Sequence, residues 1–334
     1  MLARQYPKRR TTALSTVRIA PLQPSDLAII SEAMDNRYII AATSDNTRKA
    51  YQADIRHYEI TWGGSLPAST EDVLKYLHAF ADILNPNTLA RRLIALKQWH
   101  CLQKFVDPTV SPVIAKTLRG IRRTRGKPKE KAAPLLPEHL IKIVEYLATQ
   151  NTLSSYRDSA LLQLGFLGAF RRSELIAICM EDINWQPEGI EIQLKNSKTD
   201  QLNVGQYCVI PYGNEQLCAI RALKAWCEKA NIESGTIFRR IRKSNQICED
   251  AITPESVNII LKNHAKAVGI ENYNDFSSHS MRRGLATTAS RGGVSLPAIM
   301  RQGRWKQVST VMEYIEAAQR FEENSAKQVL HKNL

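Results

Sequence analysis

Residues 119–131 read RGIRRTRGKPKEK, and this stretch divides the chain. It is basic, contains two glycines and a proline, and has almost no apolar side chain, which is typical of a linker between domains. We therefore expect an extended basic linker over residues 119–133. It would join a first domain at residues 25–118 to a second at residues 134–334, with residues 1–24 as a basic tail.

The first domain shows helical periodicity and almost no alternating pattern. Apolar residues recur three or four positions apart at Val73, Leu77 and Phe80, and again from Leu89 onward. Polar groups suited to helix starts precede the apolar runs at residues 43–45, 69–72 and 85–87. The pattern predicts a bundle of about four or five helices.

The second domain mixes helical and alternating patterns. Helical stretches are expected around residues 138–148, 155–166, 173–180 and 218–230. Between them Ile190, Ile192 and Leu194 alternate with polar residues, and residues 207–210 form a second short apolar run. This indicates a small antiparallel hairpin whose loop carries Lys198. The predicted fold is mainly α with a small antiparallel β-sheet.

The charge of the chain favours a polyanionic partner, either nucleic acid or an acidic membrane surface. Of its 334 residues, 46 are Lys or Arg and 32 are Asp or Glu, a net charge of +14. Residues 1–133 hold 22 of the basic and 11 of the acidic residues, so the excess lies mainly in the first part. No apolar run is long enough to cross a membrane.

The cysteine pattern indicates the redox state of the compartment in which the protein works. Six cysteines occur without a C-x-x-C pair, in a chain large enough to bury a core without disulfides. A reduced cytoplasmic compartment is expected, either the cytosol or the nucleoid. The basic residues 1–24 lack the apolar stretch of a secretory signal, and an organellar transit peptide is the alternative to a loose tail.

Metal and nucleotide cofactors are not indicated. The seven histidines do not cluster, and the sequence contains no H-E-x-x-H, no phosphate-binding G-x-x-x-x-G-K-[ST] and no G-x-G-x-x-G. We expect a protein that works without a cofactor or a metal ion.

Three short motifs in the second domain do suggest a chemistry. They are GAFRRSEL at residues 168–175, HSMR at 279–282, and GRW at 303–305, followed nine residues later by Tyr314. Their order and spacing resemble the tyrosine recombinase/integrase family, also called the phage integrase family. Residues 293–300 and 311–315 resemble its Cre-like subgroup. The resemblance runs from about Thr47 to the C-terminus and implies a two-domain clamp on DNA, with a helical core-binding domain and a mixed α/β catalytic domain.

The chemistry of phosphodiester cleavage explains why such residues belong together. Guanidinium groups stabilise the nonbridging oxygens of a phosphate in the transition state, and Arg171 and Arg282 would form that clamp. The resemblance makes Tyr314 the nucleophile that gives a 3′-phosphotyrosyl link. Since a free tyrosine is protonated at neutral pH, His279, three residues before Arg282, is the candidate for proton transfer or transition-state contact.

The remaining site residues are implied in the same way. Lys198 would be the general acid for the departing 5′ oxygen, with Lys195 as its nearest rival. Glu174, three residues after Arg171, would orient that arginine. Trp305 stands where most of the family has histidine; its indole N–H can donate to a phosphate but cannot transfer a proton. Taken singly, each residue has an ordinary structural interpretation, such as helix packing for Tyr314.

The expected partner is double-stranded DNA with recombination target sites. The candidate DNA contacts are Arg91, Arg92, Lys97, Arg122, Arg123 and Arg125. The family implies a homotetramer on DNA and strand exchange through a Holliday junction. The tail from Phe321 would dock on a neighbouring subunit or fold back on its own domain. Two rival functions remain: a type IB topoisomerase-like enzyme and a non-catalytic DNA-binding protein of the same fold.

Overall fold

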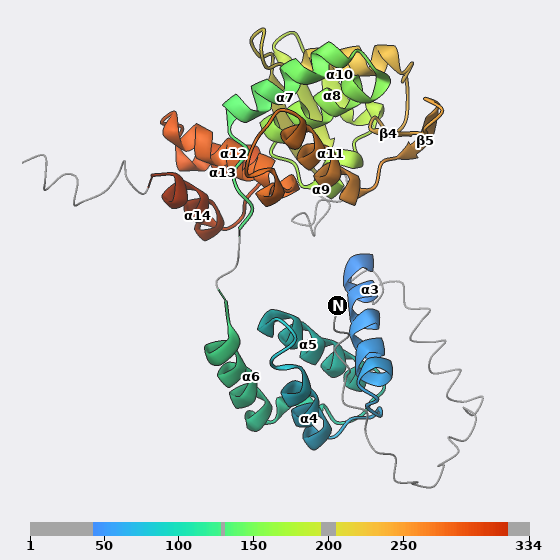
Figure 1. The fold of residues 1–334 in the computed structure, drawn as a ribbon, viewed down its shortest axis with the longest axis vertical. Coiled ribbons are helices and arrows are strands. Elements are labelled where there is room, and N and C mark those ends of the chain that lie inside the picture. The colour runs from blue at the N-terminus through green and yellow to red at the C-terminus, as the bar shows by residue number, and fades with distance from the viewer. Residues whose placement is uncertain (1–42, 128–130, 195–204, 320–334) are drawn as a thin grey trace, which may run out of the picture. The chain divides into compact units, whose positions relative to one another are not determined.

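The computed structural model describes residues 43–127, 131–194 and 205–319, in two compact units, Met1–Lys129 and Glu130–Leu334 (Figure 1). Both units are mainly helical, and the second contains small antiparallel sheets. The fold class expected from the sequence is thereby confirmed. Each unit is described by itself below.

The described part of the first unit consists of helices. They are α3 Asp45–Arg56, which continues as the π-helical turn η1 His57–Thr61, α4 Thr70–Phe80, α5 Pro86–Leu102, the 3-10 turn η2 Pro108–Val110, and α6 Pro112–Arg125. The predicted helix starts are confirmed, because the side chains of Ser44, Ser69 and Asn85 each accept a hydrogen bond from a backbone N–H in the first turn. Aromatic residues such as Tyr58 and Tyr76 fill the core between these helices.

The expected linker at residues 119–133 is partly helical. Residues 119–125 are the last two turns of α6 and not an extended linker. The physical reason is the spacing of Ile114, Leu118 and Ile121, which places all three on the face that packs against the core of the first unit. The four arginines of residues 119–125 are exposed on the other side of this helix.

The second unit begins with an extended segment and continues through helices and short strands. Its helices are α7 Pro137–Gln150, α8 Leu153–Leu167, α9 Arg172–Ile176, the 3-10 turn η3 Met180–Asp182, α10 Ala219–Lys229, α11 Pro254–Ala267, the 3-10 turn η4 Tyr273–Asp275, α12 Ser278–Arg291, α13 Leu296–Gly303 and α14 Val308–Gln319. Its strands are β1 Ile183–Trp185, β2 Gly189–Leu194, β3 Gln206–Pro211, β4 Arg239–Ile241 and β5 Ile247–Ala251. The helix predicted at residues 173–180 is shorter than expected, because α9 ends at Ile176 and Cys179 forms an isolated β-bridge with Thr236.

Strands β2 and β3 form the predicted antiparallel hairpin, with Ile192 opposite Cys208. Strand β1 extends this sheet on the other side of β2, giving the order β1-β2-β3. A second sheet pairs β4 with β5. The alternation of Ile190, Ile192 and Leu194 reflects burial, since all three side chains point into the core.

Two apolar clusters position the chemistry-bearing segments. The larger one surrounds α8, which packs between α7 and α10 and is anchored by Trp226, whose Nε1 donates to the carbonyl of Ile237 at 2.9 Å (Figure 1). The smaller one contains Ala286, Ile299 and Val311 and joins α12, α13 and α14. These three helices bring residues 279–314 together.

Candidate active site

Arg171 lies immediately before α9, and Glu174 fixes its side chain. The backbone N–H of Arg171 donates to Oε2 of Glu174 at 3.0 Å, and its guanidinium donates to Oε1 of the same carboxylate. Burial raises the pKa of Glu174, but the hydrogen bonds and charge of Arg171 and the charge of Arg304 outweigh it and lower that pKa overall. Glu174 is thus a buried carboxylate that holds Arg171 in one orientation.

Arg282 reaches the same place from α12. Its Nη2 donates to the carbonyl of Gly303 at 2.8 Å and its Nη1 donates to the carbonyl of Ala169, while its guanidinium carbon lies 4.7 Å from the ring centroid of Trp305. Burial, followed by the neighbouring charge of Arg171, lowers the pKa of Arg282 to about 10. The two arginines therefore meet in one partly closed site, 4% of the Arg282 surface being exposed.

Tyr314 lies on α14 beside these groups. Its ring meets that of Trp305 edge to face, with centroids 6.1 Å apart and planes at 65°. The guanidinium carbon of Arg283 lies 5.2 Å from the centroid of the Tyr314 ring. The tyrosine is half-buried at the edge of the smaller apolar cluster, so packing fixes the ring.

His279 stands at the first turn of α12, one turn before Arg282. The backbone N–H of His279 donates to Oγ of Ser277, which caps the helix, at 3.2 Å, and the His279 side chain is exposed. The same helix thus carries both the buried arginine and the exposed imidazole, on neighbouring turns.

Lys198 and its rival Lys195 lie outside the described residues. The strand that follows them, β3, is tied to α13 by Gln302, whose Nε2 donates to the carbonyls of Leu167 and Val209 at 2.8 and 3.1 Å. The base of the hairpin is therefore attached to the helix that ends in the GRW motif.

Arg304 belongs to the same cluster, although sequence reasoning assigned it no role. Its Nη2 lies 3.1 and 3.3 Å from the carbonyl oxygens of Gly168 and Ala169 and 3.5 Å from Oε2 of Glu174. The GRW motif contained this arginine, but nothing in the local pattern distinguished it from a surface charge. The contacts join segments about 130 residues apart, which periodicity does not report.

Comparison with known proteins agrees with this geometry. The model of the phage integrase family matches residues 135–320. The integrase/recombinase xerD homolog of Selenomonas ruminantium is 35% identical over 307 residues, which cover 89% of each chain. This chain belongs to the phage integrase family. Recombinase cre of Escherichia phage P1 is 25% identical over 266 residues, which cover 75% of this chain and 76% of cre.

Solved structures support the fold of this tyrosine recombinase family member. The structure of the Tn1549 transposon integrase in complex with circular intermediate DNA matches with a TM-score of 0.59 at 16% identity, covering 92% of this chain and 99% of that one. The lambda integrase bound to DNA matches with a TM-score of 0.57 at 14% identity, covering 89% and 96%. At these identities the likeness concerns the fold alone.

The predicted DNA contacts of this recombinase fall into two groups. Arg91 and Arg92 are both engaged by Asp54, and Arg92 also donates to Nδ1 of His57 and the hydroxyl of Tyr76, at 2.8 and 2.9 Å. The other four are exposed, Lys97 on α5 and Arg122, Arg123 and Arg125 on α6. Of these, Arg125 pairs with Asp82 at 2.6 Å. Arg92 is thus a structural residue of the first unit.

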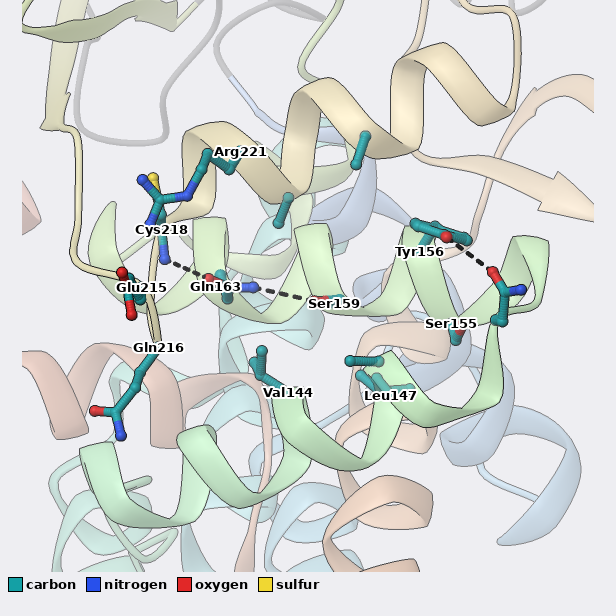
Figure 2. Close-up of a pocket in the computed structure, with 14 residues that line it drawn as sticks. Val144, Leu147, Ser155, Tyr156, Ser159, Gln163, Glu215, Gln216, Cys218 and Arg221 are labelled. Atoms are coloured by element: carbon teal, nitrogen blue, oxygen red, sulfur yellow. Dashed lines mark hydrogen bonds between the residues drawn. The ribbon is translucent and has the colours of Figure 1, made fainter.

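A pocket of about 300 Å³ lies apart from the arginine cluster, between α7, α8 and α10 (Figure 2). Gln163 is hydrogen-bonded within the pocket: it donates to Ser159 at 3.0 Å and accepts from the backbone N–H of Cys218 at 2.8 Å. None of the six predicted catalytic residues that the structure describes lines it.

Two features are absent from the described residues: a cluster of metal ligands and a helix able to span a membrane. No three side chains of His, Cys, Asp or Glu in this part of the chain gather as ligands for a metal ion. In the same residues, no helix combines the length and the apolar character that a membrane crossing needs.

Proposed function

We propose that this protein is a site-specific DNA recombinase that cuts and rejoins strands through a phosphotyrosyl intermediate at Tyr314. The observation that carries the proposal is a cluster of three groups: Arg171, held by the buried carboxylate of Glu174, and Tyr314 both lie close enough to the Arg282 guanidinium to shift its pKa. Membership of the phage integrase family and DNA in the structures of similar fold support it.

Charge stabilisation is the proposed task of Arg171 and Arg282. Both guanidiniums are pre-oriented, Arg171 by a carboxylate and Arg282 by two carbonyls and the face of Trp305. Groups fixed before the reaction stabilise the developing charge of the phosphorane-like transition state without reorganisation. Removing either should raise the barrier by about 3 kcal/mol, comparable to the loss of an oxyanion donor.

The proposed covalent step is an in-line exchange at phosphorus. The phenolic oxygen of Tyr314 forms a bond to phosphorus while the bond to the 5′ oxygen breaks, leaving a 3′-phosphotyrosine and a 5′-hydroxyl. His279 takes the phenolic proton and Lys198 supplies the proton of the departing oxygen. Attack by the 5′-hydroxyl of another strand reverses the step, so no external energy source is needed.

DNA binding is assigned to exposed basic residues, not to those already paired inside the fold. On the outer face of α6, Arg122 and Arg123 are exposed, as is Lys97 on α5. Phosphate contacts by such residues supply most of the affinity and orient the protein on the duplex. A homotetramer acting on two sites, with sequential exchanges through a Holliday junction, completes the proposal.

Covalent capture tests the proposal by letting the protein select its own target sequence. The full chain is incubated with a pool of nicked duplexes of randomised sequence, in which a short strand diffuses away after cleavage and traps the adduct. Protein–DNA adducts that survive denaturation are isolated and their DNA is sequenced. We expect the pool to converge on one sequence and the adduct to form through Tyr314.

Tyr314→Phe is the matched variant, because it keeps the ring beside Trp305 and Arg283 and removes only the nucleophilic oxygen. It should bind the selected duplex as the wild type does and form no adduct. A wild-type protein that binds a duplex tightly yet never forms an adduct would contradict the chemistry and favour a non-catalytic DNA-binding protein. Relaxation of supercoiled plasmids lacking the selected sequence would favour the topoisomerase-like alternative.

A further inference from the structure

We propose that Arg304 is a positioning residue for strand cleavage, which holds Glu174 and the turn before Arg171 so that the guanidiniums of Arg171 and Arg282 keep their places. The inference rests on the proposed recombinase function and adds to it a residue that contacts no DNA itself. Four kinds of observation carry it: the contacts of Arg304, its backbone, its burial and the balance of charge around it.

The first observation is that Arg304 and Arg282 bridge the same two segments. Arg304 donates to the carbonyls of Gly168 and Ala169 in one segment and to that of Gln302, at 2.8 Å, in the other. Arg282 donates to the carbonyls of Ala169 and Gly303. Two guanidiniums therefore hold together the turn before Arg171 and the end of α13.

The second observation is the backbone of both segments. Arg304 has a φ of 54° and Ala169 a φ of 43°, left-handed conformations that favour glycine. Each conformation is unfavourable for a residue with a Cβ and persists only where surrounding contacts enforce it. Glycine would relieve the strain at position 304, so the side chain must contribute something that offsets this cost.

The third observation concerns burial. Only 7% of the Arg304 surface is exposed, its guanidinium carbon lies 4.8 Å from the centroid of the Phe170 ring, and its Nε has no hydrogen-bond partner among the described residues. Burying a cation is unfavourable unless an opposite charge and hydrogen bonds compensate for its lost hydration. Arg304 is covered by the turn it holds, so it acts on other residues of the site and not on DNA.

The fourth observation is the charge balance. Glu174 pairs with both Arg171 and Arg304, while Arg282 is bonded to carbonyls. Nη2 of Arg304 lies 3.5 Å from Oε2, while the guanidinium of Arg171 donates to Oε1. With Arg304 in place, Glu174 has one orientation, and so has the guanidinium of Arg171 that it binds. A displacement of about 1 Å at a reacting group lowers rates by about 100-fold.

The test uses the full chain, a fluorescent duplex selected by covalent capture, and three readouts: the dissociation constant, the single-turnover rate of adduct formation, and thermal melting. Arg304→Gly removes the side chain and relieves the left-handed backbone, which protects the fold. Arg304→Lys keeps the charge and loses the two-pronged geometry. Arg301→Gln, at an exposed arginine in the last turn of α13, controls for loss of charge.

We expect Arg304→Gly to bind the duplex within about threefold of the wild type and to form adduct about 10- to 100-fold more slowly. Arg304→Lys should be intermediate, and Arg301→Gln should cleave like the wild type. Adding Glu174→Gln to Arg304→Gly should slow cleavage by less than about threefold more, because both changes release Arg171.

Each other outcome overturns the inference. Cleavage by Arg304→Gly within threefold of the wild type would show that the rate does not depend on this residue. An equal loss of binding, melting temperature and rate would show general structural support only. Fully additive losses with Glu174→Gln would show that Arg304 does not act through that carboxylate. Absence of an adduct from the wild type itself would instead overturn the proposed function, and this inference with it.

Discussion

The two arginines of the site are fixed by different means, and the difference matters for a phosphate. Arg171 is bound by a carboxylate, which orients it but offsets part of its charge. Arg282 is bound by backbone carbonyls and the face of Trp305, which orient it and leave its charge whole. Arg282 therefore supplies most of the net positive charge of the site. Glu174 holds the N–H donors of the Arg171 guanidinium in a fixed direction.

The lowered pKa of Glu174 predicts how the stability of the protein depends on pH. In the folded chain the pKa of this carboxyl lies below the ordinary value of 4.5. The stabilisation from its ionised form is therefore fully present above about pH 4.5 and is lost as the pH falls through the lowered pKa. We expect Glu174→Gln to unfold at lower urea concentration than the wild type at neutral pH, and the difference to shrink below pH 4.5.

Urea unfolding followed by tryptophan fluorescence at a series of pH values measures this. Glu271→Gln, an exposed glutamate of the same unit, is the control and should unfold like the wild type throughout. A constant difference between Glu174→Gln and the wild type across the whole series would contradict the assignment of the lowered pKa to this carboxylate.

In the first unit, neighbouring arginines on α5 should behave differently. The Asp54 side chain is 2% exposed, Arg92 11% and Arg91 49%. Arg92→Ala removes the more buried partner of that carboxylate and the hydrogen bonds to His57 and Tyr76, and should lower the free energy of unfolding by about 3 kcal/mol. Arg91→Ala should lower it by less than about 1 kcal/mol, because about half of the Arg91 side chain is exposed and Arg92 still pairs with Asp54 in this variant.

Urea unfolding of the full chain separates these effects, and affinity for the selected duplex supplies the comparison. Burial and Arg92 lower the pKa of His57, so the ring is neutral and accepts the hydrogen bond from Arg92 at neutral pH. Equal losses of DNA affinity in both variants, with unfolding unchanged, would instead restore both residues as DNA contacts.

At the scale of elements, α12 is the part on which the site depends, and an extended segment crosses it closely. The backbone N–H of Leu135 donates to the carbonyl of Ser280 at 2.9 Å. A Cβ at Gly284 would lie 1.8 Å from the carbonyl oxygen of Leu135. Gly284→Ala should therefore lower the melting temperature, with a loss of about 2 kcal/mol or more, and slow cleavage.

Gly120→Ala is the matched control: this glycine lies inside α6, and apart from its chain neighbours and the backbone of its own helix nothing lies within 4 Å of an added Cβ. It should stabilise the protein by about 0.5–1 kcal/mol, because alanine restricts the unfolded chain and favours the helix. Thermal melting compares the two variants. If Gly284→Ala were as stable as the wild type, the extended segment would have to move away from α12 without any loss of stability.

These elements also show how much the sequence can predict. Helix starts at Ser44 and Ser69 and the hairpin of β2 and β3 were predictable, because capping and alternation are local. Strand β1 was not predictable, because three residues are too short to show an alternating pattern. The full length of α6 was not predictable either, because its basic residues obscured the spacing of Ile114 and Ile121. The motifs named Arg171 and Arg282 but not Arg304, because its role arises from contacts between distant segments.

At the scale of the whole molecule, the net charge of +14 predicts binding that weakens steeply with salt. Each phosphate neutralised contributes roughly −0.9 to the slope of log affinity against log salt. Arg122 and Arg123 are exposed on α6 and have no ion pair of 4.0 Å or less among the described residues. Replacing both with glutamine should therefore reduce the magnitude of the slope by about 2.

The measurement is fluorescence anisotropy of the selected duplex and of an unrelated duplex over a range of salt concentrations. Affinity for both should fall by a similar factor, because phosphate contacts carry no sequence information. Lys224→Gln with Lys229→Gln removes the same charge from exposed positions of α10 and is the control. If this pair changed the slope as much as the α6 pair, net charge alone would govern binding, and α6 would have no particular contact with the phosphate backbone.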